Sequence, residues 1–495
     1  IGLPETRLGI VPAWGGCTRL PRLVGIPRAL DLILNGKTPG ARQALRYGLI
    51  DEIAPREWLQ KAALKAIHAH MADPRGPRNV ALNFFHKAVA LGVQHKVRAD
   101  LMRKTRGHYP APLKAMEIIL EGAGESDLSA SLARERAAIT ELVQQPQARN
   151  LFHIFMLQET AKKQTRVHPG PAVEQAAVVG AGVMGSGIAQ WLSSKGIRVI
   201  LRDISREKVA AGIGRIAKLY RDGVRRHAFT GREARDGIDR IIPAPEEVPL
   251  EHVDLVIEAA VEKLEIKRSL FGELEDKVGS DTILATNTSA LPVHEIARGL
   301  KHPGRVLGLH FFNPVHRMPL VEIVVPEGVS SEAREAAIRF VGQIGKLPLV
   351  VRDTPGFLVN RVLVPYLVEA AEAFERGATA SAIDEAMLDF GFPMGPLRLV
   401  DEVGLDIALE VAETLAKAYP DRMHVPPILE AMVQAGCLGR KVGRGFYNHR
   451  KGKTSVNLEA YELRRVREPR VPDMNRVRAR MVFHLLDRSE EHTSE

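Results

Sequence analysis

The chain has little cysteine and no long apolar run, and each shortage excludes a class of protein. Its 495 residues contain two cysteines, Cys17 and Cys437. Two thiols cannot supply a disulfide framework or a thiolate metal site, so we expect no metal and a reducing compartment, the cytoplasm. No apolar run reaches the roughly 18 residues that a membrane span needs. We therefore expect no transmembrane segment.

Aromatic residues are also scarce, at 5% of the chain, although the formal net charge is +10. A basic chain attracts phosphate-bearing ligands. Nucleic acid is nevertheless a poor candidate partner, because no recognition motif and no basic stripe interleaved with aromatic residues accompanies the charge. An apolar content of 45% over this length allows several buried cores, so we expect three or more domains.

The most informative segment is VVGAGVMGSG at residues 178–187. Gly180, Gly182 and Gly185 stand between an apolar run and a helix-like segment. In a dinucleotide-binding turn the first glycine allows the tight turn, the second admits the pyrophosphate, and the third lets the helix pack on the strand. The next apolar run ends at Asp203, where a carboxylate can bind the adenosine ribose and repel the extra phosphate of NADP. This context favours an NAD site over an ordinary glycine turn.

Apolar strand candidates alternate with helical stretches through the middle of the chain, which predicts a parallel, doubly wound α/β sheet. Residues 1–150 are mostly helix-forming and have no second glycine turn. The basic stretch 162–171 is typical of a linker, and the pattern beyond Pro355 is helical. The strand candidates are residues 176–179, 199–201, 253–257, 282–285, 306–310, 320–325 and 347–351.

Candidate catalytic groups are concentrated in GLHFFNPVHRMPLVEIV, residues 308–324. His310 ends one apolar run and Glu322 opens the next, and Pro314 and Pro319 reverse the chain between them. The two side chains can therefore face each other. A histidine held by a carboxylate has a fixed tautomer and a stabilised imidazolium, which suits it to take a proton from an alcohol while hydride leaves the same carbon. The alternative is an ordinary buried histidine with a satisfied hydrogen bond.

Residues 172 to about 450 resemble the L-3-hydroxyacyl-CoA dehydrogenases. The resemblance is carried by four motifs in order: the glycine turn, NTSAL at 287–291, HFFNPVHRMPLVEIV at 310–324 and DTPGFLVNRVL at 353–363. It implies NAD-dependent oxidation of an L-3-hydroxyacyl-CoA to a 3-ketoacyl-CoA in fatty acid β-oxidation.

The same resemblance divides the chain. It implies a Rossmann-type NAD domain over 172–353 and an all-α dehydrogenase domain over 354–450. Residues 451–487 are expected to begin a second, similar helical unit. The final RSEEHTSE, residues 488–495, we expect to be an artefact that takes no part in the fold.

The dehydrogenase resemblance also implies roles for single residues. His310 is expected to be the catalytic acid/base and Glu322 its orienting partner. Ser289 and Asn360 would hold the hydroxyl and thioester region of the substrate, and asparagine is otherwise an awkward choice inside a helix. Besides the three glycines, the residues expected at the NAD site are Met184, Asp203, Glu262, Lys267, Ser289 and Asn313.

Residues 2–25, GLPETRLGIVPAWGGCTRLPRLVG, resemble a second family, the crotonase or enoyl-CoA hydratase/isomerase fold. The resemblance implies that residues 1–150 are the C-terminal part of such a domain and that Glu5 is one of its two catalytic glutamates. In hydration one carboxylate activates water while the other delivers a proton to the α-carbon. The second glutamate and the oxyanion hole lie upstream in that family, so we expect an incomplete hydratase site.

A crotonase domain joined by a linker helix, residues 151–171, to such a dehydrogenase is similar to the α-subunits of bacterial fatty acid oxidation complexes and of their mitochondrial trifunctional counterparts. This resemblance implies truncation at both ends, 3-hydroxyacyl-CoA and enoyl-CoA substrates, and a thiolase β-subunit as partner. Two alternatives stay open. One is a related NAD enzyme, such as a hydroxyacid dehydrogenase that uses a lysine base. The other is a chain without activity, which serves only as a docking scaffold for thiolase or does not fold well.

Overall fold

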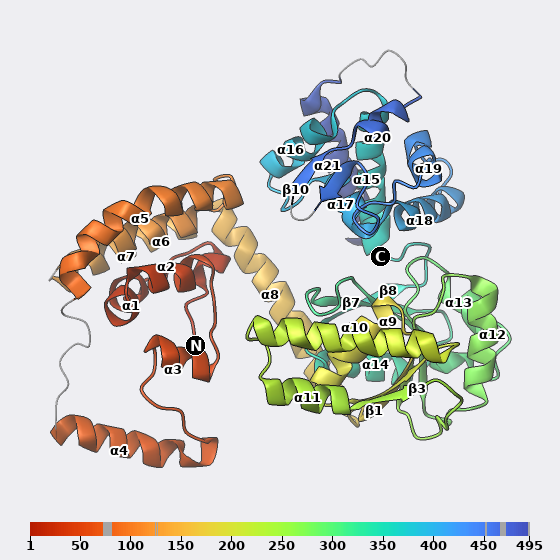
Figure 1. Ribbon diagram of the computed structural model, residues 1–495, viewed down its shortest axis with the longest axis horizontal. Coiled ribbons are helices and arrows are strands. Elements are labelled where there is room, and N and C mark those ends of the chain that lie inside the picture. Colours follow the sequence, from red (N-terminus) through yellow and green to blue (C-terminus); the bar gives the residue numbers. More distant parts are fainter. Residues whose placement is uncertain (73–81, 124, 126, 451–452, 466–471, 494–495) are drawn as a thin grey trace. The chain divides into compact units, whose positions relative to one another are not determined.

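A computed structural model of the chain describes residues 1–72, 82–123, 125, 127–450, 453–465 and 472–493 (Figure 1). The chain divides into two compact units, Ile1–Gln158 and Glu159–Glu495. Among the described helices, none has both the length and the apolar character that a bilayer crossing requires. The described residues also contain no group of three or more His, Cys, Asp or Glu side chains arranged to hold a metal ion.

The described residues of the first unit form helices joined by loops, without a strand among them. The buried apolar faces of α1, α2, α6 and α7 form its core. Within this core, Glu135 of α7 accepts hydrogen bonds from the backbone amides of Gly15 (2.6 Å) and Thr18 (2.7 Å), which satisfies the start of α1. The elements are η1 Glu5–Leu8, α1 Gly16–Val24, α2 Ile26–Leu34, α3 Ala41–Tyr47, η2 Arg56–Trp58, α4 Leu59–Ala72, α5 Leu82–Thr105, α6 Pro110–Glu121 and α7 Leu128–Val143, and α8 Pro146–Val167 continues from this unit into the second.

An eight-stranded sheet dominates the first part of the second unit. Its strand order is β3-β2-β1-β4-β5-β6-β7-β8, so the chain reverses its direction across the sheet between β1 and β4. Ligands bind at such switch points in open α/β sheets. The strands are β1 Gln175–Val179, β2 Arg198–Arg202, β3 Ile241–Ala244, β4 Leu255–Glu258, β5 Ile283–Thr286, β6 Val306–Phe311, β7 Leu320–Val325 and β8 Leu347–Arg352.

Helices cover both faces of this sheet (Figure 1). Ala176 and Val178 of β1 face one apolar core, and Ala177 and Val179 face the other, as the two-residue period of a strand requires. One core packs against α9 Val183–Ser194, α10 Arg206–Arg225, α11 Gly231–Asp239 and α14 Ser331–Gln343. The other packs against α12 Leu264–Glu275 and α13 Val293–Ala297; the short η3 Pro303–Arg305 precedes β6.

The predicted α/β class is confirmed, but two details of the sheet differ from the prediction. β7 runs antiparallel to β6, because the loop 312–319 is too short for the crossover that a parallel pair requires. The other neighbouring strands are parallel. β3 is absent from the predicted strands. It is short, contains Pro243 and lies at the sheet edge, where proline is tolerated.

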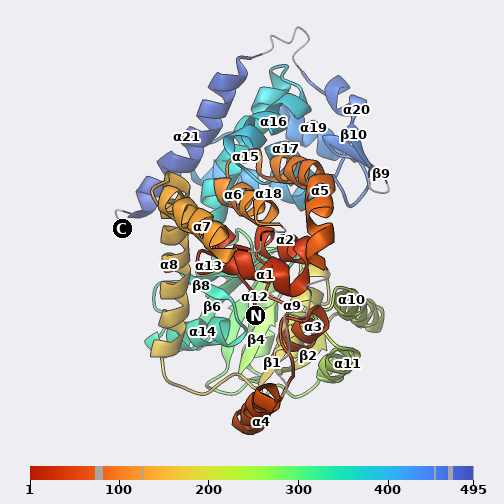
Figure 2. The same ribbon diagram turned by 90° about the vertical axis from the view of Figure 1, so that its left-hand side faces the viewer.

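A helical domain completes the second unit, as predicted, but it also contains one short antiparallel hairpin, β9–β10, which the predicted all-α class lacks. The central helix is α15, whose Ala370 and Phe374 are fully buried. Val477 and Met481 of α21 lie in the same apolar core, and α21 runs beside α15 and α16 (Figure 2). A separate unit over 451–487 stays a prediction. The elements are α15 Val359–Glu375, α16 Ala380–Phe390, α17 Pro396–Val403, α18 Leu405–Ala418, α19 Pro427–Gln434, the hairpin β9 Tyr447–Arg450 and β10 Lys453–Val456, α20 Leu458–Glu462 and α21 Met474–Thr493.

Candidate active site

The turn between β1 and α9 has the shape of a phosphate cradle. Gly180 has a φ of +109°, and a Cβ atom there would lie 2.4 Å from the carbonyl oxygen of Ala259. A Cβ on Gly185 would lie 1.7 Å from the carbonyl oxygen of Gly180, so α9 packs directly on the turn. A Cβ on Gly182 would meet nothing within 4 Å. The backbone therefore faces open space in front of the amides of α9, which fits a pyrophosphate.

Asp203, directly after β2, braces this turn. Its Oδ2 accepts a hydrogen bond from the amide of Ala181 (2.7 Å), and its Oδ1 accepts one from the amide of Ile204 (2.7 Å). Arg215 of α10 donates to the carbonyl oxygen of Ala181 (3.0 Å). The carboxylate is thus fixed beside the cradle, at the strand end that suits a ribose. Met184 of α9 is half-buried against the sheet core.

A buried ion pair lies at the C-terminal end of β4. Lys267 of α12 donates to both carboxylate oxygens of Glu258 (2.7 and 2.8 Å), and its Nζ lies 3.3 Å from Oε2 of Glu262. Glu258 also accepts hydrogen bonds from the hydroxyl of Thr286 and the amide of Ala260, both at 2.6 Å. The ammonium of Lys267 is therefore held in one position by a carboxylate that is itself saturated with donors.

Glu262 connects this ion pair to the loop after β5. Its Oε1 accepts hydrogen bonds from the hydroxyl of Thr288 (2.5 Å) and from the amide (2.8 Å) and hydroxyl (3.1 Å) of Ser289. Burial alone would raise the pKa of Glu262, but the Lys267 ammonium and these donors together hold that pKa below its usual range. Asn360 of α15 donates to the carbonyl oxygen of Ser289 (2.9 Å), so sheet and helical domain meet here.

His310 and Glu322 lie directly opposite each other on the antiparallel strands β6 and β7. Nδ1 of His310 is 2.7 Å from Oε2 of Glu322. His310 is 7% exposed and Glu322 is fully buried. The other oxygen of Glu322 accepts hydrogen bonds from the amides of Leu358 (3.0 Å) and Val359 (2.8 Å) at the start of α15. A carboxylate only accepts, so the neutral imidazole carries its proton on Nδ1 and presents the lone pair of Nε2.

Two aromatic rings flank the imidazole of His310. The ring centroid of Phe312 is 4.5 Å away and that of Phe357 is 5.8 Å away. Phe357 is fully buried and has a φ of +50°, which is uncommon for a residue other than glycine. Its turn directly precedes the amides that bind Glu322, so the strained backbone helps to aim them.

The remaining predicted residue of the NAD site, Asn313, is exposed on the loop 312–319. Val315 of that loop packs on α9, since a Cβ on Gly187 would lie 3.1 Å from a Val315 methyl carbon. The loop therefore borders the helix that begins at the glycine turn. Asn287 accepts a hydrogen bond from the amide of Phe311 (2.8 Å) and ties the end of β6 to the loop after β5.

The structure thus brings the predicted residues together in three groups within one unit: His310 with Glu322, Asp203 with the glycine turn, and Glu262 with Lys267, Ser289 and Asn360. Glu258 is a site residue that the sequence analysis missed. The available signal was a carboxylate at the C-terminal end of a fully apolar strand, next to the switch point of the sheet.

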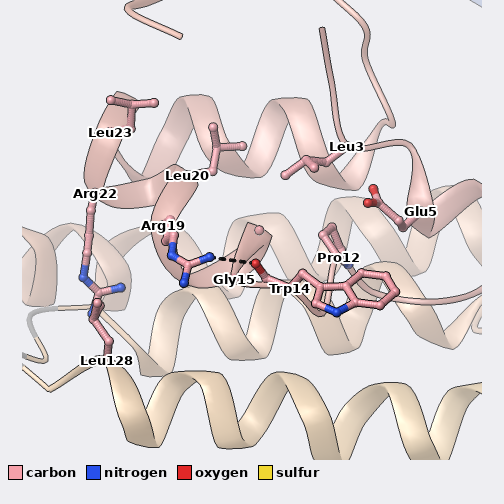
Figure 3. Close-up of a pocket in the computed structure, with 11 residues that line it drawn as sticks. Leu3, Glu5, Pro12, Trp14, Gly15, Arg19, Leu20, Arg22, Leu23 and Leu128 are labelled. Atoms are coloured by element: carbon pink, nitrogen blue, oxygen red, sulfur yellow. Dashed lines mark hydrogen bonds between the residues drawn. The ribbon is translucent and has the colours of Figure 1, made fainter. Parts of the chain in front are cut away.

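Glu5 belongs to the other unit. It borders a pocket of about 560 Å³ whose walls are mostly apolar (Figure 3). Oε2 of Glu5 is buried and has no hydrogen-bond partner among the described residues. Across the same pocket, Arg19 donates to the carbonyl oxygen of Trp14 (2.8 Å). The expected role of Glu5 as one of two catalytic glutamates stays a prediction.

Three family profiles match the chain in order. Residues 1–108 match the enoyl-CoA hydratase/isomerase family, residues 175–354 the NAD-binding domain of 3-hydroxyacyl-CoA dehydrogenase, and residues 356–449 the C-terminal domain of 3-hydroxyacyl-CoA dehydrogenase. The second profile covers the sheet with its glycine turn, and NAD is therefore the cofactor.

Solved structures agree with these profiles. FadB2 of M. tuberculosis is 39% identical, with a TM-score of 0.56 over 57% of this chain and 100% of that one. The (S)-3-hydroxybutyryl-CoA dehydrogenase PaaH1 of Ralstonia eutropha is 36% identical, with a TM-score of 0.54 over 57% of this chain and 100% of that one. The 3-hydroxybutyryl-CoA dehydrogenase of Escherichia coli K12 is 38% identical, with a TM-score of 0.54 over 58% of this chain and 61% of that one. The chain therefore belongs to the 3-hydroxyacyl-CoA dehydrogenase family, as an NAD-dependent oxidoreductase of β-oxidation that also carries an enoyl-CoA hydratase/isomerase segment.

Proposed function

We propose that His310 is the base that takes the hydroxyl proton when the chain oxidises an L-3-hydroxyacyl-CoA to a 3-ketoacyl-CoA. The observation that carries this proposal is the buried 2.7 Å contact between His310 Nδ1 and Glu322 Oε2. Oxidation of an alcohol removes a proton from oxygen and a hydride from carbon. When bound, NAD supplies the hydride acceptor.

The proton is received at Nε2 of His310, the ring nitrogen that carries the lone pair. The imidazolium that results is stabilised by the adjacent carboxylate of Glu322, which two backbone amides hold in place. The rings of Phe312 and Phe357 limit the access of water to the imidazole. Water therefore competes poorly with the substrate hydroxyl for Nε2.

Ser289 and Asn360 are the groups that we assign to the substrate. The hydroxyl of Ser289 donates to Glu262, so its oxygen lone pairs remain to accept a hydrogen bond from another donor of the bound ligands or from a water molecule. Asn360 uses one amide proton on the carbonyl of Ser289, and among the described residues its other proton and its oxygen have no partner. Both residues therefore combine a fixed position with unused hydrogen-bonding capacity.

NAD would be held by the glycine turn and by the groups around it. The fit rests on the open space at Gly182 and on the fixed carboxylate of Asp203. Lys267 and Glu262 supply a charged pair beyond the C-terminal end of β4. The full set that we assign to NAD is Gly180, Gly182, Met184, Gly185, Asp203, Glu262, Lys267, Ser289 and Asn313.

The direct test follows NADH absorbance with 3-hydroxyacyl-CoA thioesters of graded chain length and with the matching free 3-hydroxyacids. Oxidation of the thioesters but not of the free acids is expected. The alternative with a lysine base predicts the reverse. The buried lysine of this site is Lys267, whose Nζ is already engaged as a donor to both oxygens of Glu258.

Replacing Asp203 is expected to change cofactor choice. In Asp203→Ala the KM for NAD should rise roughly tenfold. The amide of Ala181 in the glycine turn loses its hydrogen bond, and the ribose of NAD loses a hydrogen-bond acceptor. The preference for NAD over NADP should narrow in Asp203→Ala and also in Asp203→Asn, since both remove the charge that repels the 2′-phosphate. The measurement is kcat/KM with each cofactor. An unaltered NAD to NADP ratio in both variants would contradict the assignment.

We further propose a thiolase β-subunit as partner and the bacterial cytoplasm as compartment. The presence of hydratase/isomerase and dehydrogenase segments on one chain supports the first, since thiolysis consumes a 3-ketoacyl-CoA. Co-elution of the chain with a purified 3-ketoacyl-CoA thiolase in gel filtration tests it. A non-enzymatic docking scaffold predicts co-elution without any NAD-dependent shift of the melting temperature, whereas a dehydrogenase shows that shift.

A further inference from the structure

A buried lysine outside the three groups fastens the loop between β6 and β7. Lys346 directly precedes β8 and is 5% exposed. Its Nζ donates to the carbonyl oxygens of Val315 (2.7 Å) and Met318 (2.6 Å). The amide of Leu347 donates to the carbonyl oxygen of Pro319 (2.8 Å). Three carbonyls of one short loop are therefore bound to two adjacent residues.

The indole of Trp191, on α9, covers this ammonium. Nζ of Lys346 lies 4.5 Å from the ring centroid, and Nζ of Lys195 lies 4.4 Å from it. The indole is itself anchored, because its Nε1 donates to the carbonyl oxygen of Ile344 (3.0 Å). In the described part of the chain no carboxylate forms an ion pair with Lys346. The buried charge is balanced by two carbonyl dipoles and one aromatic face alone.

We propose that Lys346 is a positioning residue of the dehydrogenase site, which sets the loop that carries Phe312 and Asn313. This inference rests on the proposed function. Phe312 packs on the imidazole of His310, and Asn313 is assigned to NAD. A buried cation without a carboxylate costs stability relative to an apolar side chain of the same size. If the side chain only filled space, methionine would therefore give the more stable protein. What lysine adds is an ammonium that fixes the positions of the two loop carbonyls.

The charge of Lys346 is open to titration near neutral pH. Burial, followed by the nearby Lys195 ammonium, lowers the pKa of Lys346 to about 8. A neutral amine donates weaker hydrogen bonds to carbonyls and loses its attraction to the indole. The hold on the loop is therefore complete well below pH 8 and weakens as the pH rises through that value.

The other charged groups around this loop are His316 and Arg317, with Arg226 and Asp222 of α10 beside His316. Burial, then Arg317 and Arg226, lower the pKa of His316 from its usual 6.5. His316 is therefore neutral above pH 7 and does not titrate in the range where Lys346 does.

Trp191 gives a readout that does not depend on turnover. The sequence has three tryptophans, and Trp14 and Trp58 lie in the other unit. In a W14F/W58F background the emission of Trp191 reports the ammonium that lies on its face. We expect an emission change with a midpoint near pH 8, and we expect it to be absent in Lys346→Met and Lys346→Arg. Lys195→Met, which removes the other ammonium from the same ring, should retain the change.

The kinetic arm measures the KM for NAD and kcat separately. Lys346→Met should raise the KM for NAD about tenfold and lower kcat, since two hydrogen bonds to the loop are lost. In the unsubstituted chain the KM should rise between pH 7 and 9.5, and Lys346→Arg should remove that rise because arginine stays charged. Lys195→Met should keep the wild-type KM within twofold.

A folded Lys346→Met with unchanged KM and kcat would overturn the proposal. If Lys346→Met does not melt cooperatively, the pH series decides: a Trp191 emission and a KM that are constant from pH 7 to 9.5 would overturn it equally. The emission titration is independent of His310. Failure of the proposed function, seen as full turnover in His310→Ala, is therefore distinguishable from failure of the role of Lys346.

Discussion

His310→Ala is expected to lower the turnover number by roughly 10²- to 10⁴-fold while the affinity for NAD stays nearly the same. In the proposed mechanism the imidazole receives the hydroxyl proton, and its tautomer is set by Glu322, whose Oε2 lies 2.7 Å from Nδ1. Alanine leaves the glycine turn and Asp203 untouched, so binding of the cofactor should persist. The measurements are NADH formation under saturating 3-hydroxyacyl-CoA and NAD titration by fluorescence.

His294 provides a matched control for this variant. Its Nδ1 also lies 2.7 Å from a carboxylate, that of Asp353, but the side chain is 57% exposed. His294→Ala should therefore leave the turnover number unchanged. The turnover number of Glu322→Gln should lie between those of His310→Ala and His294→Ala. The amide oxygen can still accept a hydrogen bond from Nδ1, but without a charge it no longer stabilises the imidazolium. Wild-type turnover in His310→Ala would remove this residue from the mechanism.

Two substitutions in the glycine turn are expected to separate folding from cofactor binding. Gly185→Ala places a methyl group 1.7 Å from the carbonyl oxygen of Gly180, so α9 must move away from β1. A loss of roughly 1–3 kcal/mol of stability is expected from such overpacking. Gly182→Ala points its methyl group into open space, so the melting temperature without NAD should change little. The NAD affinity should nevertheless fall about a hundredfold, because the methyl group occupies the approach of the pyrophosphate.

Thermal melts with and without NAD measure both effects. Gly272 of α12 gives the control, since a Cβ there also meets nothing within 4 Å and lies away from the turn. Gly272→Ala should stabilise the chain slightly and preserve the NAD-dependent shift of the melting temperature. A wild-type shift in Gly182→Ala would show that the cofactor does not approach this part of the turn.

The sequence was sufficient for the elements with strong local patterns. The apolar runs predicted at β1, β2, β7 and β8 are strands. The spacing of the three glycines also predicted the reason why each position of the turn excludes a side chain. β3 was missed because its short apolar pattern contains Pro243. The apolar runs alone predicted a parallel sheet, because such a run does not reveal its direction; the chain reversal predicted at Pro314 and Pro319 is what makes β7 antiparallel to β6.

The site shows the same division. His310 and Glu322 are close enough in sequence for a hairpin to pair them, so their contact could be anticipated. The partner of Lys267 could not. Glu258 stands nine positions earlier, at the end of a strand, and only the packing of α12 on the sheet brings the two together. The loop-fastening role of Lys346 depends on carbonyl oxygens, which every residue has and which leave no mark in the sequence.

The second oxygen of Glu322 makes the sheet segment of the dehydrogenase depend on the helical segment that follows it. That oxygen is satisfied by amides of Leu358 and Val359, which belong to the helical segment. A chimera that grafts this sheet onto a foreign helical segment would leave half of the carboxylate without donors and free to rotate away from the imidazole. We therefore expect a chimera joined at residue 353 to keep its turnover only where the incoming sequence rebuilds the same turn.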